Sequence, residues 1–167
     1  MKGQTEIIIF ILLFIIGISL FTSATIWGKA IFQQNIDLAK VSTSENFLKD
    51  LNNNILNLVK FGGSREMDYN LDGTIELFND KTIEIKTTVS LELPRNWVNL
   101  TSDSFYIRER LDGNIFRIQL IYPEKDYKIE LFTEGPKLAQ PDTVKIERNS
   151  TNLSSVPPVI KIKITFT

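Results

Sequence analysis

The sequence predicts an α+β fold in which a long N-terminal helix packs on an antiparallel β-sheet. Three observations lead to this prediction. An apolar run fills the start of the chain, the hydrophobic periodicity is helical up to Phe61, and it switches to a two-residue alternation after Gly63. We therefore expect a transmembrane helix over residues 4–28, an amphipathic helix over 29–62 and an antiparallel β domain over 63–167.

The first helix has the length and composition of a membrane span. The residues from Ile7 to Phe21 are almost all apolar, and the uncharged run continues to Trp27. About 20 apolar residues at 1.5 Å each cross the ~30 Å hydrocarbon core of a bilayer, where a helix satisfies its own backbone hydrogen bonds. Trp27 and Lys29 suit the far interface. A simple uncleaved anchor and a buried core helix are alternatives, whereas the long apolar run and the lack of an Ala-x-Ala site disfavour a cleaved secretory signal.

The second helix carries an apolar stripe. Ala30 to Phe61 contains neither Pro nor Gly. Apolar side chains there repeat every seven residues in two series offset by three or four positions, namely Val41, Leu48 and Ile55, and Leu51 and Leu58. Further apolar residues widen the stripe enough to pack on a globular domain, namely Leu38, Phe47, Leu56, Val59 and Phe61. Gly62-Gly63 should end this helix. The helix could run unbroken from Gln4 to Phe61. The alternative is a break near Ser42-Thr43-Ser44, where a hydroxyl could cap a second helix.

The rest of the chain alternates apolar and polar residues over several short runs. They include Ile83–Leu91, Phe105–Ile107, Phe116–Leu120, Tyr127–Leu131, Val144–Ile146 and Ile160–Phe166. A hairpin turning on Asp112-Gly113 would place Ile107 opposite Ile118. Because the runs are sequential and joined by short turns, we expect an antiparallel meander.

The composition argues against several functional classes. The chain has no Cys, which excludes a disulfide framework and a Cys nucleophile, and it has no His, the commonest general base and zinc ligand. The formal net charge is −1, so no broad field for nucleic acid is implied. We therefore expect a protein that is not an enzyme and does not bind nucleic acid.

One segment resembles the start of a calcium-binding loop. Residues 68–75 read Asp-Tyr-Asn-Leu-Asp-Gly-Thr-Ile, in which Asp68, Asn70 and Asp72 would direct oxygens to one point and Thr74 would add a carbonyl. The twelfth position, which normally supplies a bidentate Glu, is Asn79. The alternative is a hairpin on Asp72-Gly73, but that turn would pair polar with apolar faces. Ca²⁺ is the only cofactor that the sequence suggests.

Two surface features remain. Asn99, Asn149 and Asn152 each begin an Asn-x-Ser/Thr triplet, the acceptor sequence of N-glycosylation, and residues 149–155 suggest a surface loop. Ordinary polar turns are the alternative.

Arg108, Arg110 and Arg117 lie on facing strands, and we expect a charged surface interleaved with Glu109 rather than a ligand site, with Trp97 as a packing residue.

The first residues carry a more specific motif. Lys2-Gly3-Gln4, followed by Glu6 and the apolar helix, resembles the class III signal of archaeal type IV pilin-like proteins over about the first 35 residues. The resemblance implies that a prepilin peptidase cuts between Gly3 and Gln4, so that residues 1–3 form a leader peptide. Family members usually place the helix-start Glu at mature position five, whereas Glu6 would be position three.

The resemblance also implies a function and the lollipop shape of pilins. The chain would be a structural subunit of a type IV pilus-like filament or a minor pilin, assembled with other subunits through its apolar helix. Its β domain would lie outside the cell, in the membrane-anchored form or in an extracellular filament, and could serve cell adhesion. Glu6 would pair with the amino terminus of a neighbouring subunit, unless it is an interfacial Glu favoured by the helix dipole. The alternative function is an uncleaved single-pass membrane anchor with an extracellular binding or adhesion module.

Overall fold

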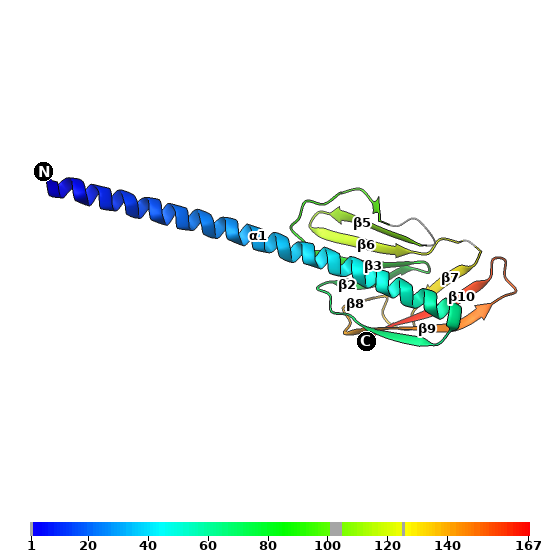
Figure 1. Cartoon of the computed structure of the whole chain (residues 1–167). Helices are drawn as coiled ribbons and strands as arrows, with labels where there is room; N and C mark the ends of the chain where they lie inside the picture. Colours follow the sequence, from blue (N-terminus) through cyan, green and yellow to red (C-terminus); the bar gives the residue numbers. More distant parts are fainter. Residues whose placement is uncertain (1, 101–104, 125) are drawn as a thin grey trace. The chain divides into compact units, whose positions relative to one another are not determined.

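The computed structural model describes residues 2–100, 105–124 and 126–167, with side chains from Ile7 onward (Figure 1). One helix, α1 (Lys2–Phe61), precedes ten strands in these residues. The strands are β1 (Ser64–Asp68), β2 (Thr74–Asn79), β3 (Thr82–Thr88), β4 (Val98–Asn99), β5 (Tyr106–Asp112), β6 (Ile115–Ile121), β7 (Lys128–Phe132), β8 (Leu138–Ala139), β9 (Thr143–Asn152) and β10 (Val159–Phe166). The chain divides into two compact units, which meet between Asp37 and Leu38. The last part of α1 therefore belongs to the same unit as the strands, and the α+β class is confirmed.

One face of α1 packs into this unit along the predicted stripe. Its most buried apolar side chains are at most 1% exposed, namely Leu48, Leu51, Ile55 and Leu58. Leu38 and Phe61, which we expected to widen the stripe, are instead 49% and 83% exposed. At 3.6 residues per turn, both point about 100° or more away from the centre of the buried face, so the sheets do not reach them.

The end of α1 was predicted correctly, and of the two alternatives for its interior the continuous helix is present. Gly62 has a φ of 73°, and its N–H donates to the carbonyl of Leu58 at 2.8 Å, which closes the helix with a left-handed glycine. The helix continues through Ser42-Thr43-Ser44. The Ser44 hydroxyl donates to the Lys40 carbonyl at 2.8 Å, so it bonds within the helix and does not cap a new one.

The larger sheet has six antiparallel strands in the order β4-β5-β6-β3-β2-β8. The predicted β5–β6 hairpin is present, but its turn is Gly113-Asn114, so Ile107 lies opposite Leu120 and the expected pairing with Ile118 is wrong. The reason is the glycine. Gly113 has a φ of 67°, whereas non-glycine residues with positive φ do not occur in the described chain. A type II′ turn needs such a residue at its first central position.

The smaller sheet corrects the predicted meander. Its order is β1-β9-β10-β7, and β10 pairs antiparallel with β9 but parallel with β7. After β7 the chain passes through β8, which pairs with β2 in the other sheet. Because β8 does not pair with β7, the edge of β7 is open to β10. The intervening residues 133–158 supply the long connection that a parallel pair needs.

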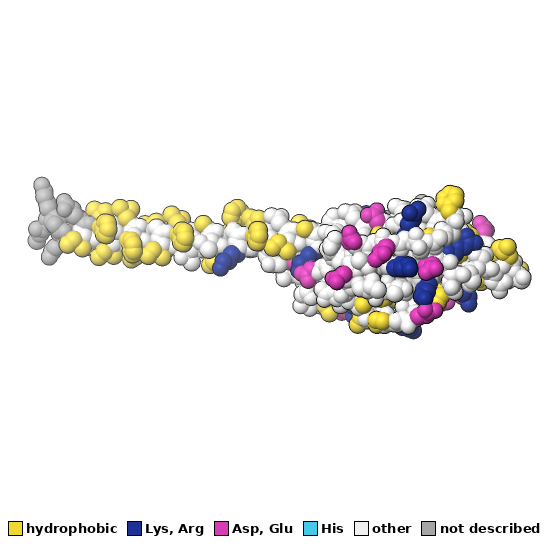
Figure 2. Space-filling view, turned by 90° about the horizontal axis from the view of Figure 1, so that it is seen from below, with side chains coloured by type: hydrophobic (Ala, Val, Ile, Leu, Met, Phe, Trp, Pro, Cys, Tyr) yellow, Lys and Arg dark blue, Asp and Glu magenta, His cyan; other side chains and the backbone are white. Residues whose placement is uncertain are grey.

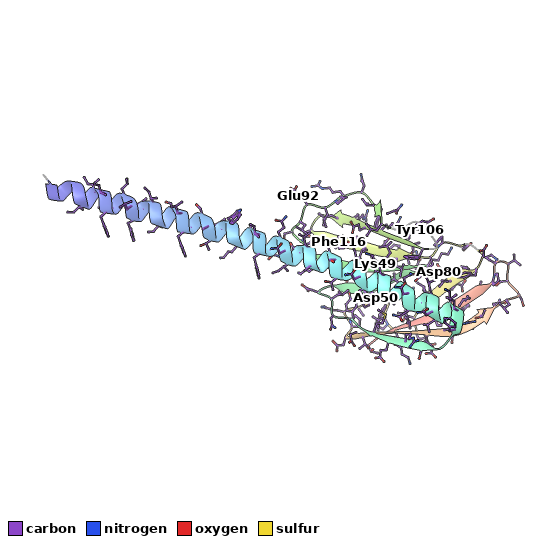
Figure 3. The ribbon with its side chains drawn as sticks, viewed as in Figure 1. Lys49, Asp50, Asp80, Glu92, Tyr106 and Phe116 are labelled. Carbon is purple, nitrogen blue, oxygen red and sulfur yellow. The ribbon has the colours of Figure 1, made fainter. Side chains whose placement is uncertain are left out.

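A single hydrophobic core joins α1 to both sheets. In β10 the predicted alternation is confirmed, because Ile160, Ile162, Ile164 and Phe166 are all at most 8% exposed. Phe116 on β6, labelled in Figure 3, is fully buried in the same core. This core holds the last part of α1, the loop after β1 and both sheets together.

Candidate functional site

The first candidate site is the apolar surface of α1 before the β domain. From Ile7 to Gly28 the chain carries no charge, and every side chain there is exposed (Figure 2). These 22 residues measure about 33 Å at the 1.5 Å rise of a helix. Among the described residues, α1 is the one helix long and apolar enough to cross a membrane.

Three hydroxyl groups within this surface are bonded inside the helix. Ser19, Thr22 and Thr25 donate to the carbonyls of the residues four positions earlier, at 2.9, 2.9 and 2.8 Å. A hydroxyl without a partner in hydrocarbon costs several kcal/mol, and these bonds remove that cost. The segment is thus chemically suited to lipid and equally to the apolar interior of a helix bundle.

The predicted processing and assembly residues lie in the first turns of the same helix. Lys2, Gly3, Gln4 and Glu6 all fall within α1, which begins at Lys2. Their side chains lie outside the described part of the chain. Cleavage after Gly3 and the charge pair of Glu6 therefore stay predictions.

The second candidate site is the loop between β1 and β2, which is not a hairpin. Asp68 ends β1, which pairs with β9, while Thr74 begins β2, which pairs with β3. Tyr69 holds the loop against the core. Its N–H donates to Asp142 at 2.8 Å, and its buried ring meets Phe47 edge-on, with ring centroids 5.2 Å apart. The alternative of a hairpin on Asp72-Gly73 is therefore wrong.

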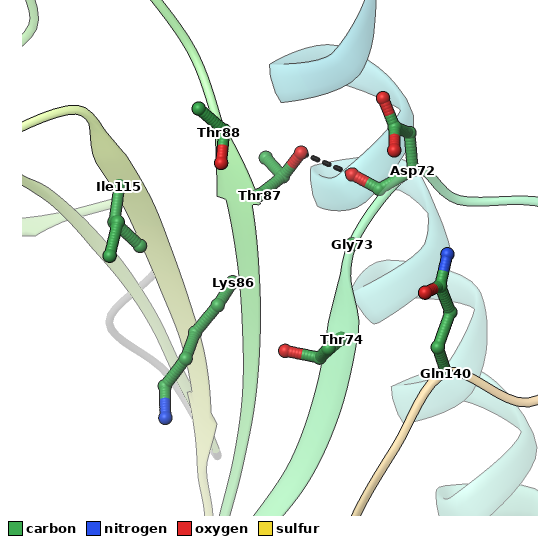
Figure 4. A pocket seen from close by; sticks show the side chains of 8 residues that line it. All are labelled: Asp72, Gly73, Thr74, Lys86, Thr87, Thr88, Ile115 and Gln140. Atoms are coloured by element: carbon green, nitrogen blue, oxygen red, sulfur yellow. Dashed lines mark hydrogen bonds between the residues drawn. The ribbon is translucent and has the colours of Figure 1, made fainter.

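The polar groups of Asp72 already have protein partners. Its carboxylate lies 2.6 Å from the Lys40 ammonium, and its carbonyl accepts a hydrogen bond from the Thr87 hydroxyl (Figure 4). Beside them is a pocket of about 320 Å³, lined by Asp72, Gly73, Thr74, Lys86, Thr87, Thr88, Ile115 and Gln140. Within the described residues, no three Asp, Glu, His or Cys side chains converge on one point. Calcium binding by Asp68, Asn70, Asp72 and Thr74 stays a prediction.

Glycine at position 73 is required by a close approach of two strands. A Cβ atom there would lie 2.4 Å from the carbonyl oxygen of Lys86, far inside van der Waals contact. The backbone at Gly73 can therefore pass β3 only without a side chain. The Asp-Gly dipeptide, which suggested either a calcium loop or a hairpin, has a steric role in this fold.

Sequence reasoning missed a charged network on the outer face of the six-stranded sheet. Glu84 on β3 is 0% exposed, and its carboxylate accepts a hydrogen bond from the Gln119 amide at 3.0 Å. The same carboxylate lies 3.2 Å from Lys86 and 3.6 Å from Arg117. A hydrogen bond to Glu76 is the main cause of the raised pKa of Lys86. The alternation Ile-Glu-Ile-Lys in β3 indicates that Glu84 lies on the outer face of the sheet. It does not indicate that Glu84 is buried there, because long side chains from neighbouring strands shield it from solvent.

The arginines of the β5–β6 hairpin are partnered on the same outer face. The guanidinium carbons of Arg108 and Arg110 lie 4.4 and 4.7 Å from the centre of the Trp97 ring, within cation–π distance. Arg117 lies 3.3 Å from the Asp112 carboxylate. The expected interleaving with Glu109 is wrong, because alternation along β5 turns Glu109 to the opposite face.

On that opposite face, Glu109 meets α1. Burial is the main cause of the raised pKa of the Glu109 carboxyl, and the charge of Glu45 adds to it, while Lys49 acts in the other direction. Glu45 itself pairs with Lys49 at 3.3 Å. Glu109 thus faces an already paired carboxylate, and its ionised form is disfavoured in the folded protein.

The glycosylation triplets occupy different structural settings. Asn99 lies on the edge strand β4, and its Thr101 lies outside the described residues. The predicted loop at 149–155 is partly wrong, because β9 continues to Asn152. Asn149 lies at a bulge, where Ser150 pairs with Lys161 but the next β10 residue pairs with Arg148. All three asparagines are exposed.

No family model, no curated protein and no solved structure matches this chain. The strongest chemical feature is the exposed, charge-free apolar surface between Ile7 and Gly28, since the charged groups of the β domain are largely paired with one another.

Proposed function

We propose that this protein is a structural subunit of a type IV pilus-like filament, or a minor pilin, cleaved between Gly3 and Gln4. The single observation that carries the proposal is the exposed apolar surface of α1 from Ile7 to Gly28. An apolar surface of this extent marks a membrane or protein interaction site, because monomeric soluble proteins rarely expose one. The resemblance of residues 2–6 to a class III signal supplies the filament pathway.

The apolar segment would serve twice. In the membrane it anchors the chain, with Trp27 and Lys29 near one interface. On assembly it leaves the lipid for contacts with the same segment of other subunits. Since lipid tails are as apolar as the helix, packing and internal hydrogen bonding must favour this transfer. The hydroxyls of Ser19, Thr22 and Thr25 are bonded within their own helix, so neither environment leaves them without a partner.

The β domain would then form the outer surface of the filament. Its outward-facing charges are paired on both sheets, as in the ion pair of 2.7 Å between Lys128 and Glu130 on β7. Paired charges keep a surface hydrated without a strong net field. We infer a role in the properties of the filament surface, including adhesion.

The second candidate function is an uncleaved, membrane-anchored binding or adhesion module. The length of the apolar segment favours it equally, because about 33 Å of helix anchors a chain with or without cleavage. The two functions differ at the N-terminus, where only the filament subunit loses its first three residues.

The decisive experiment examines that terminus. The full chain is co-expressed with an archaeal prepilin peptidase, and its intact mass and first residue are measured, with an established pilin as the processing control. The filament proposal expects a product that begins at Gln4. An intact chain beside a cleaved control would refute it and favour the anchored module.

Assembly has a separate test at Glu6. We predict that Glu6→Ala reduces filament yield strongly but leaves membrane insertion unchanged, because the charge would pair with a neighbouring amino terminus and not with lipid. Filaments sheared from cells and the membrane fraction are quantified together, with Thr5→Ala as the neighbouring control. Equal filament yield from Glu6→Ala and Thr5→Ala would contradict the charge pair.

A further inference from the structure

The structure distinguishes the two adjacent glycosylation triplets near the β9–β10 turn. Asn152 is the last residue of β9, and its side-chain oxygen accepts a hydrogen bond from the Ser154 N–H at 3.0 Å. Asn152, Leu153 and Ser154 are all exposed. This triplet therefore lies on an open turn, in which the Asn amide and the Ser154 hydroxyl are both accessible to an enzyme.

The triplet at Asn149 is also exposed at its Asn, but its third residue is bonded to the rest of the fold. Its third residue is Thr151, whose hydroxyl accepts hydrogen bonds from Nε and Nη2 of Arg148 at 3.0 and 2.6 Å. The same guanidinium donates to the carbonyl of Val59 at 3.1 Å, in the last turn of α1. Engaging this hydroxyl in an enzyme would break contacts that fasten the helix end to the small sheet.

The turn after Asn152 also carries uncovered apolar side chains. Leu153 is 78% exposed and Val156 is 99% exposed, although the β domain has a well-formed core. Sugar rings present C–H groups as well as hydroxyls, so a glycan on Asn152 could cover part of this apolar surface while remaining hydrated.

We propose that Asn152 is an N-glycosylation acceptor of the folded domain and that Asn149 is not. In the reaction, Nδ2 of Asn152 bonds to the anomeric carbon of an oligosaccharide carried on a polyprenyl phosphate. The bond from that carbon to the phosphate oxygen breaks, the lipid phosphate leaves with the electron pair, and Nδ2 loses one proton. In cells the modification rests on the proposed function, which places the β domain outside.

The test uses the full chain purified in detergent. A purified single-subunit oligosaccharyltransferase and its lipid-phosphate-linked oligosaccharide are added, and glycopeptide mass spectrometry measures the occupancy of each Asn. A synthetic peptide of residues 147–156 contains both triplets without the fold and serves as the matched control. In the folded chain we expect at least about tenfold more glycan on Asn152 than on Asn149, since releasing Thr151 breaks the two hydrogen bonds that its hydroxyl accepts from Arg148. In the peptide, both sites should be modified comparably.

Two variants sharpen the result. Ser154→Ala should abolish modification of Asn152 without changing the fold of this exposed turn. Arg148→Ala frees the Thr151 hydroxyl, so it should raise occupancy of Asn149 towards the peptide value. An unmodified Asn152 in the wild-type chain, or a site ratio equal to that of the peptide, would overturn the proposal whatever the variants do.

A parallel measurement in cells separates this inference from the proposed function. Protease added to intact cells shows whether the β domain is outside. If purified chain is modified at Asn152 but the domain in cells is protected and bare, the placement outside fails while the acceptor assignment holds. If the domain is accessible in cells and purified chain remains bare at Asn152, the assignment fails while the placement holds.

Discussion

A buried hydrogen bond between α1 and the six-stranded sheet gives the sharpest test of how the β domain is held together. The Tyr122 hydroxyl, just after β6, donates to the side-chain oxygen of Asn52 at 3.0 Å, and the two residues are 3% and 1% exposed. Burial raises the pKa of Tyr122 well above its ordinary value, so the hydroxyl remains a proton donor throughout the usual pH range. The bond joins elements 70 residues apart in sequence.

The perturbation is Tyr122→Phe, which removes one oxygen and leaves the ring in place. Because the amide oxygen of Asn52 would then be buried without its donor, we expect the free energy of unfolding to fall by about 1–3 kcal/mol. Asn52→Leu should cost a similar amount, since it leaves the Tyr122 hydroxyl unsatisfied. The double variant Asn52→Leu/Tyr122→Phe replaces both partners with apolar groups and should recover most of the loss.

The assay is urea unfolding of the full chain in mild detergent. A Trp27→Phe background leaves Trp97 as the single fluorescent tryptophan, and it lies in the β domain. Tyr106→Phe, which alters a ring that is only partly buried, is the matched control and should change stability by less than about 0.5 kcal/mol. Strictly additive single-variant losses in the double variant, or no loss in Tyr122→Phe, would refute the reasoning.

Three further predictions concern the β domain. Gly73→Ala should destabilise it by about 1–3 kcal/mol, because the new Cβ would lie 2.4 Å from a β3 carbonyl oxygen, and unchanged urea unfolding would disprove the close approach. Burial and the charge of Glu45 raise the folded-state pKa of the Glu109 carboxyl, while Lys49 opposes them. The protonated carboxyl therefore contributes its full stability below the ordinary Glu pKa, and this contribution is lost as the pH rises through the raised value. Glu109→Gln should thus be more stable than wild type at pH 7 and lose this advantage in acid, and a pH-independent difference would contradict the assignment. Arg148→Ala should cost about 1–2 kcal/mol and increase hydrogen exchange selectively in the last turn of α1, because its guanidinium caps a carbonyl there.

The hydrophobic pattern predicted which faces are buried more successfully than which strands are paired. Leu48, Leu51, Ile55 and Leu58 repeat at helical spacing, and all four are buried, because a helix has only one face to offer. The alternation in β10 likewise indicated its inner face. It contains no information on the neighbour, so the parallel pairing with β7 could not be derived from it.

One candidate site could likewise be predicted from the sequence, whereas another could not. The apolar surface from Ile7 to Gly28 follows directly from composition, because a run of this length needs no tertiary partner to be recognised. The Glu84 network does not, since its members come from three strands whose register the sequence left undetermined. Asp68–Thr74 matched a loop motif at the level of residue types. In the fold, Asp72 also forms an ion pair with Lys40 and Gly73 allows a close approach to β3, and the motif indicated neither.

The attachment of α1 to the β domain has a mechanical consequence. Any tension applied to the N-terminal segment enters the domain through the backbone of this helix, whose residues Leu48, Leu51, Ile55 and Leu58 are buried in series along the core. Drawing the helix out lengthwise would have to shear these contacts together, and the hydrogen bond from Arg148 to Val59 fastens its far end. Resistance to such a load is set by the rate of unfolding, so the domain should extend at much higher force when pulled along α1 than when its sheet edges are peeled apart.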